Sequence, residues 1–323
     1  IAAVVIMLCT FDMEYDELLA NLKKAGGWLP AILGLWVFIY LINALSWYII
    51  IRDDEGCKVP FWKIYKLTIT GFALNYATPV GLMGGEPYRI MELKPYIGIE
   101  RATSSVILYV MMHIFSHFCF WLSSVLLYVC LYPVGWMMGI ILGAITVFCL
   151  LIVILFMKGY RQGMAVAFVR MGGRIPFLKK KVFHFANAHK EKLENIDKQI
   201  ALLHQQKKQT FYSALLLEYI ARVVSCLEIW LILNVLTTHV SFADCCLIAA
   251  FSSLLANLLF FLPMQLGGRE GGFALAVGGL SLSGAYGVYA ALITRVREMV
   301  WIVIGLVLMK VGNFKQSKER YSA

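Results

Sequence analysis

The sequence has 323 residues, of which 60% are hydrophobic and 15% charged, with a mean hydropathy of +0.75. These values lie far outside the range of soluble globular domains, so a bilayer must serve as the solvent. The net charge of +10 comes from Lys and Arg beside hydrophobic runs, which favours the cytoplasmic membrane surface over nucleic acid as a partner. The eight cysteines lack any metal-binding or disulfide spacing, so we expect no metal and no cofactor.

Hydrophobic runs long enough to cross a bilayer recur along the whole chain. A run at 1–11 is expected to be the remainder of a first helix, and the next run covers 28–51. Residues 102–157 contain no Asp, Glu, Lys or Arg and have room for two helices that turn near Pro133. Further spans are predicted at 211–236, 245–262 and 284–309. We therefore predict one all-α, polytopic membrane domain over 1–323.

A basic connector at 158–210 separates a first half, 1–157, from a second half, 211–323. The positive-inside rule places this connector and the basic C-terminus in the cytoplasm. Leu193, Ile196 and Ile200 recur at helical spacing, which predicts an amphipathic helix within it. A packed or membrane-surface connector and a regulatory element are both compatible with this pattern.

Two segments, 61–90 and 245–283, carry matching motifs that glycine and proline interrupt. Each has an Asn, a Pro, a Gly-Gly pair and a neighbouring acid and base. The members are Asn75, Pro79, Gly84, Gly85, Glu86 and Arg89 in the first, and Asn257, Pro263, Gly267, Gly268, Arg269 and Glu270 in the second. Pro and paired Gly permit a tight reversal. The first motif lies between two cytoplasmic ends and the second between two external ends, which predicts an inverted repeat with two re-entrant, broken-helix hairpins.

Charged side chains at membrane depth cost about 2.5 to 3.5 kcal/mol each on insertion scales and are retained mainly when they are paired or functional. The freed N–H groups at each following helix start favour an anion. The candidate substrate-binding residues are Arg89, Arg269, Arg295, Glu86, Glu270, Asn75 and Asn257. Purely structural pairing of the acids and bases is the alternative.

Other polar residues interrupt the predicted spans. Glu218 and Arg222 lie one helical turn apart, and so do Arg295 and Glu298. Each set could pair structurally or complete a polar pocket. His113 and His117 also share a helix face, but no HExxH motif accompanies them. Interhelical hydrogen bonding or a proton-sensitive role is therefore favoured over metal binding.

The motifs PVGLMGGEPYR and LPMQLGGREGG, together with ALITRV around Arg295, resemble the flippase-like membrane domain of lysylphosphatidylglycerol synthases, the multiple peptide resistance factors. The resemblance covers nearly the whole chain, although the first motif has a longer insertion between Pro79 and Gly84. It implies transfer of a phospholipid or a polyprenyl-phosphate-linked glycolipid between the leaflets of the inner membrane. No aminoacyltransferase domain follows Ala323, so lysine transfer by this chain is not expected.

These patterns together predict a lipid flippase or scramblase. Arg269, Arg89 and Arg295 would bind an anionic lipid headgroup, while Glu86 and Glu270 would hold the arginines in place. A transporter of a small soluble anion and an accessory subunit of lipid glycosylation, with a lipid-modifying enzyme as partner, are the alternatives. A cavity that opens laterally to lipid would favour the flippase. No catalytic constellation is visible, so we do not expect an enzyme.

Overall fold

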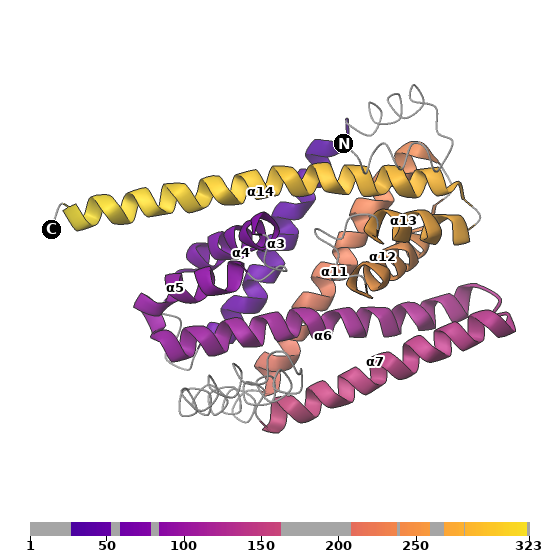
Figure 1. The fold of residues 1–323 in the computed structure, drawn as a ribbon, viewed down its shortest axis with the longest axis horizontal. Coiled ribbons are helices and arrows are strands. Elements are labelled where there is room, and N and C mark those ends of the chain that lie inside the picture. The colour runs from indigo at the N-terminus through magenta and orange to yellow at the C-terminus, as the bar shows by residue number, and fades with distance from the viewer. Residues whose placement is uncertain are drawn as a thin grey trace, which may run out of the picture.

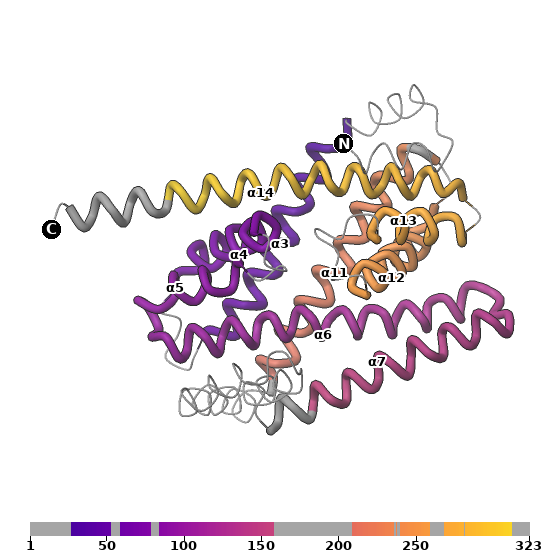
Figure 2. Tube along the Cα trace, in the orientation of Figure 1, coloured from indigo at the N-terminus to yellow at the C-terminus, as the bar shows by residue number. Residues whose placement is uncertain are grey.

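The computed structural model describes residues 27–52, 59–78, 84–162, 208–237, 240–258, 268–280 and 282–321, whose path Figure 2 shows. This part of the chain is helical and contains no strand. Its helices are α3 (Leu29–Ile51), α4 (Phe61–Ala77), α5 (Gly85–Ile97), α6 (Ile99–Leu131), α7 (Trp136–Gln162), α11 (Lys208–Leu236), α12 (Phe242–Leu258), α13 (Gly268–Gly279) and α14 (Gly284–Tyr321).

The helices coincide with the predicted hydrophobic spans. By length and composition, α3, α6 and residues 136–157 of α7 are able to cross a membrane, and α12 is a shorter apolar helix. The chain is therefore an all-α, polytopic integral membrane protein, as predicted. The run at 1–11 and most of the basic connector, including its amphipathic pattern, lie outside the described residues.

Each of the two glycine- and proline-containing segments forms a pair of short helices in contact, α4 with α5 and α12 with α13. Thr78 has an extended backbone at the end of α4, as expected for a residue that precedes a proline. Both breaks were thus predicted. Of the expected hinge residues, Pro79, Pro263 and Gly267 lie outside the described residues.

The glycines of the first pair allow close backbone approach. A Cβ on Gly85 would collide with the carbonyl oxygen of Gly71 on α4, and one on Gly84 would lie 2.7 Å from Cγ2 of Thr78. Gly84 itself has φ −75°, which any residue adopts. Glycine is therefore required at positions 84 and 85 because a side chain there would collide with α4 or with Thr78 at its end. Small residues play the same role at other contacts between membrane helices.

The two halves pack in a corresponding way. The helices α3 and α11 contact each other, α4 packs on α14, and α12 packs on α6. In Figure 1, α6 and α14 cross the view in opposite directions, with the α4–α5 pair toward one end and the α12–α13 pair toward the other. The inverted repeat and its relation to a membrane both stay predictions.

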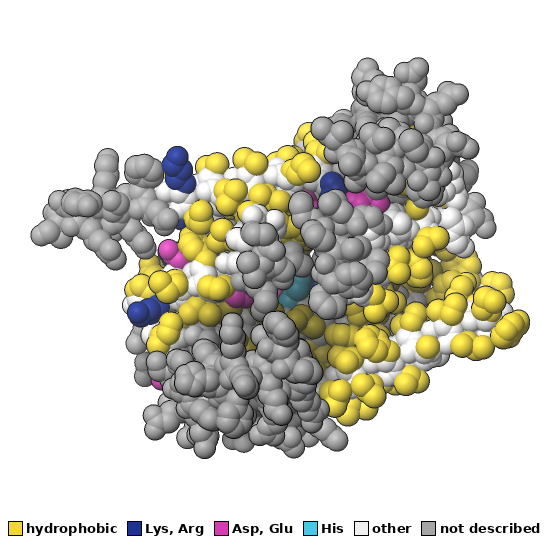
Figure 3. Space-filling view, viewed as in Figure 1, with side chains coloured by type: hydrophobic (Ala, Val, Ile, Leu, Met, Phe, Trp, Pro, Cys, Tyr) yellow, Lys and Arg dark blue, Asp and Glu magenta, His cyan; other side chains and the backbone are white. Residues whose placement is uncertain are grey.

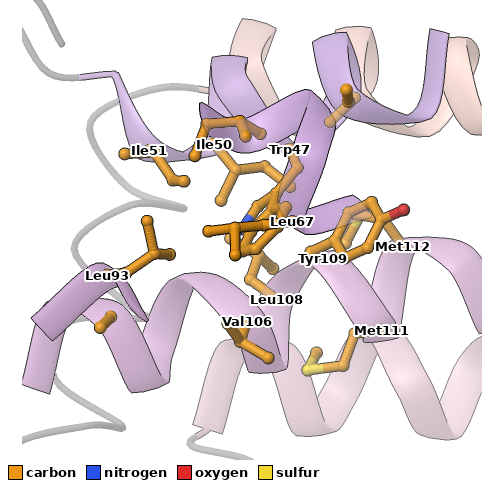
Figure 4. Close-up of a cluster of buried hydrophobic side chains, with 14 of the residues drawn as sticks. Trp47, Ile50, Ile51, Leu67, Leu93, Val106, Leu108, Tyr109, Met111 and Met112 are labelled. Atoms are coloured by element: carbon orange, nitrogen blue, oxygen red, sulfur yellow. The ribbon is translucent and has the colours of Figure 1, made fainter. Parts of the chain in front are cut away.

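The largest buried cluster joins the first four described helices. Trp47 of α3, Leu67 of α4, Leu93 of α5 and Met112 of α6 are almost fully buried in it. Figure 4 shows Leu67, Trp47 and Tyr109 together in this cluster, and the rings of Trp47 and Tyr109 stack with centroids 5.2 Å apart. This packing fixes the α4–α5 pair against α3 and α6.

Hydrophobic side chains also cover the outside of the long helices. Figure 3 shows them over α6 and α7, with few charged side chains between them. On α7, Trp136, Val147 and Leu155 are all more than half exposed. In water such a surface would be unfavourable, whereas lipid tails solvate it.

Candidate functional site

A cavity of about 730 Å³ lies at the centre of the fold, within the size range of small-molecule sites. Residues from both short helix pairs and from α3, α6, α7, α11 and α14 line it. Its charged lining residues are Glu86, Glu218, Glu228, Glu298, Arg89, Arg222, Arg269 and Arg297, and His113 and His117 also line it. Four carboxylates and four guanidinium groups balance, so the described lining is neutral when both histidines are neutral.

The guanidinium of Arg89 is fixed by contacts within the protein. It donates to the carbonyl oxygens of Leu67 and Thr68 at 3.3 and 3.2 Å. The same group lies over the rings of Trp47 and Tyr109, 5.5 and 5.4 Å from their centroids. Gly71 leaves room for it, because a Cβ there would collide with the guanidinium. The side chain therefore ties α5 to α4 from within the core.

Asn75 closes the first helix pair through its amide group. Its Oδ1 accepts the Gly85 N–H at 2.6 Å, and its Nδ2 donates to Glu86 at 3.0 Å. Glu86 also lies 3.6 Å from Arg89. The sequence predicted that the N–H groups at this helix start would be free to bind an anion. The Gly85 N–H instead donates to Asn75, and Glu86 places a negative charge in the first helical turn.

In the second helix pair, the adjacent Arg269 and Glu270 find partners on α14 instead of each other. Arg269 forms an ion pair with Glu298, and Glu270 accepts Nε of Arg295 at 3.1 Å. Arg295 also lies 3.5 Å from Glu298. Neighbouring helical residues point in different directions, so their charges are free to pair between elements. Arg269 lines the cavity, whereas Glu270 and Arg295 are not among its lining residues.

Arg297 completes this part of the lining from α14. Its Nε and Nη2 donate to the two oxygens of Glu228 on α11 at 2.9 and 3.0 Å. Trp36 of α3 stacks on the guanidinium, 3.7 Å from Cζ to the ring centroid, and donates its indole N–H to the same carboxylate at 2.9 Å. One ion pair therefore joins three long helices.

A second polar wall lies between α6 and α11. Arg222 donates to Ser116 Oγ at 3.0 and 3.1 Å, to the carbonyl oxygen of His113 at 3.1 Å and to Nδ1 of His117 at 2.9 Å. Since a guanidinium only donates, His117 must accept through Nδ1 and be neutral. Glu218 lies 2.8 Å from Nδ1 of His113, and its Oε1 is buried without a hydrogen-bond partner among the described residues.

The structure brings most of the predicted site residues to this cavity. Asn75, Glu86, Arg89, Asn257 and Arg269 line it. Within the described part of the chain, Asn257 donates to the Ser253 carbonyl oxygen of its own helix at 2.7 Å. Substrate binding by these residues stays a prediction.

The cavity is also lined by Glu218, Arg222 and Glu298, which the sequence predicted to pair structurally or to complete a polar pocket, and by Glu228 and Arg297. Their signal was present in the sequence, because each is a charge within a predicted span. Within the described ranges, no three His, Cys, Asp or Glu side chains are grouped as a metal site would require.

The cavity also has apolar margins. Ile114 of α6, Phe148 of α7 and Leu258 of α12 line it, and each is between 44% and 54% exposed. Only 28% of the most apolar window of α6 and 6% of that of α7 are buried, so both helices carry exposed apolar surface. Hydrophobic side chains that border both a polar cavity and a lipid-facing surface provide a path for a molecule with a polar and an apolar end.

The family model described as "Lysylphosphatidylglycerol synthase TM region" matches residues 1–306. No curated protein and no solved structure matches the chain.

Proposed function

Because this chain belongs to the lysylphosphatidylglycerol synthase transmembrane-region family, we propose that it moves a phosphate-containing lipid between the two leaflets of a membrane. The lipid is a phospholipid or a polyprenyl-phosphate-linked glycolipid. The observation that carries the proposal is the central cavity, with its balanced arginines and glutamates and its exposed apolar margin.

In the proposed mechanism, the headgroup passes through the polar cavity while the acyl or prenyl tails stay in the bilayer beside Ile114, Phe148 and Leu258. A phosphate in hydrocarbon has no hydrogen-bond partners, so its passage outside a protein is very slow. Guanidinium donors on the path supply charge-assisted hydrogen bonds in place of water and lower that barrier.

Arg269 is the predicted hairpin residue best situated for this role. It lines the cavity, and its side chain is 23% exposed, against 6% for Arg89 and 11% for Arg295. Glu298 neutralises it when no lipid is present. A phosphate that replaces Glu298 as its partner would leave that carboxylate with Arg295 and Arg297, which lie 3.5 and 3.8 Å away.

The apolar margin favours this function over transport of a small soluble anion, because a soluble anion enters from water and has no apolar tail to place beside the margin. We further propose that the protein resides in the cytoplasmic membrane, with the basic connector and the C-terminus in the cytoplasm. A lipid-modifying enzyme that supplies or consumes the lipid is the proposed partner.

The decisive experiment reconstitutes the purified chain in liposomes and measures transbilayer movement of fluorescent phospholipids and polyprenyl-phosphate lipids. We expect movement by the wild type and at least a tenfold loss of rate in Arg269→Gln. The matched control is Lys63→Gln, which removes an ion pair with Glu92 that does not line the cavity. Failure of intact protein to move any lipid, alone or with the native membrane extract added, would contradict the proposal.

A further inference from the structure

The polar wall between α6 and α11 differs from the rest of the cavity in how its charges are matched. Arg89, Arg269 and Arg297 each have a carboxylate within 4.0 Å. Arg222 instead contacts a hydroxyl, an imidazole nitrogen and a backbone carbonyl among the described residues, all of them neutral. Arg222 is partly buried and forms no ion pair with a carboxylate among the described residues, which favours an anionic ligand at its guanidinium.

Glu218 lies one turn before Arg222 on the same helix, and its side chain is only 1% exposed. One carboxylate oxygen contacts His113, while the other has no hydrogen-bond partner among the described residues. A buried charged acceptor without a hydrogen-bond partner is unfavourable, so the position is suited to a ligand that brings a donor.

We infer that Arg222 and Glu218 form a two-point headgroup site, in which Arg222 binds the phosphate and Glu218 accepts a hydrogen bond from a hydroxyl or ammonium group on the same headgroup. This inference rests on the proposed function. It narrows the lipid to a phosphodiester whose headgroup carries an N–H or O–H donor. The four-residue spacing separates the two groups by about 6 Å along the helix axis, a distance that a small headgroup spans.

His113 and His117 complete the site on α6. His117 accepts a hydrogen bond from Arg222, and His113 is hydrogen-bonded to one carboxylate oxygen of Glu218. The guanidinium and the carboxylate are therefore oriented before the lipid binds. Preorganised donors and acceptors lower the entropic cost of binding. Ile114 follows His113 directly, is exposed and also lines the cavity, so the site adjoins the apolar margin.

The test measures binding of soluble dihexanoyl lipids to the purified full chain in detergent by calorimetry. Dihexanoyl phosphatidylglycerol offers hydroxyl donors, the ethanolamine lipid offers an ammonium donor, and the choline lipid offers neither. We expect the wild type to bind at least one of the first two about tenfold or more tightly than the choline lipid. Arg222→Gln should weaken binding of that lipid by about tenfold to a hundredfold.

Glu218→Gln should instead reduce the preference over the choline lipid while leaving choline-lipid binding nearly unchanged. Arg222→Lys keeps the positive charge but loses the planar pair of guanidinium donors. This variant should fold normally and bind the lipid several-fold more weakly than the wild type. Lys63→Gln, outside the cavity, should bind as the wild type does. Thermal unfolding of each variant separates loss of binding from loss of fold.

Two results distinguish this inference from the proposed function. If the protein moves lipid in liposomes but Arg222→Gln and Glu218→Gln bind all three lipids like the wild type, the two-point site is overturned and the function stands. If the wild type binds with the expected preference and the variants lose it, but no lipid moves, the site stands and the function is overturned.

Discussion

Arg297 on α14 and Glu228 on α11 form a two-point ion pair, with both nitrogen–oxygen distances between 2.9 and 3.0 Å and both side chains no more than 4% exposed. The two residues are 69 positions apart in sequence, so the pair joins helices that no short loop connects. Removing one partner leaves a buried charge, which is far more costly than removing both.

We therefore expect Glu228→Gln to lower the free energy of unfolding by about 3 to 5 kcal/mol. The double variant Glu228→Gln with Arg297→Gln should recover part of this loss. Unfolding of purified protein in detergent, followed by tryptophan fluorescence, measures both. Additive losses in the double variant would contradict a direct coupling between the two groups.

Glycine at position 71 is expected to be essential for the position of Arg89. A Cβ there would collide with the guanidinium, so Gly71→Ala should cost about 1 to 3 kcal/mol by overpacking. The matched control is Gly34→Ala on α3, where no atom lies within 4 Å of the added Cβ. Thermal unfolding should show a lower midpoint for the first variant and an equal or higher one for the control.

Lipid access to the cavity margin can be measured with single cysteines in a cysteine-free background. Ile114→Cys should react with a membrane-soluble maleimide, because Ile114 is 46% exposed. Met111→Cys, three residues earlier on α6 and 4% exposed, should react at least tenfold more slowly. Equal reaction rates at the two positions would contradict lipid access at the apolar margin of the cavity.

The turn after α6 is tied to the start of α12 by a tyrosine outside the spanning helix. Tyr132 donates its hydroxyl to Asp244 at 2.7 Å, and this hydrogen bond raises the pKa of Tyr132 to about 12. Asp244 also accepts the Ser241 N–H, while Ser241 Oγ accepts the Asp244 N–H, which forms a capping box.

Tyr132→Phe should therefore lower stability by about 1 kcal/mol at neutral pH. A raised folded-state pKa means that the contribution is complete below the unfolded value near 10 and is lost as pH rises through about 12. The unfolding midpoints of wild type and variant should converge over that interval. A difference that persists above pH 12 would show that the hydroxyl does not act through Asp244.

The positions of the helices and of both breaks could be predicted from sequence because they depend on local properties. Some 20 apolar residues define a span, and Thr78 is extended because Pro79 follows it. The pairing of charges depends on long-range packing instead. Arg269 and Glu270 are adjacent in sequence, yet each pairs with a residue 25 or more positions away on α14.

The same difference explains why the sequence left the role of Arg222 open between structural pairing and a polar pocket. The glycine-rich motifs drew attention to Arg89, which the fold uses to hold two helices together. Arg222 lies in an unbroken helix with no glycine nearby, and only its charge within a hydrophobic run marks it. That an arginine lacks a carboxylate partner is visible only when the surrounding helices are in place.

The equal number of glutamate and arginine side chains around the cavity has an electrical consequence. With neutral histidines, the charges of the described lining residues sum to zero, so any movement of the cavity as a unit would carry no net charge through the membrane potential. A bound headgroup with one net negative charge would make the loaded protein voltage-sensitive, by about 2.3 kcal/mol for each 100 mV that the charge crosses. A zwitterionic headgroup would cross without that bias, so the voltage dependence of transport would report the charge of the cargo.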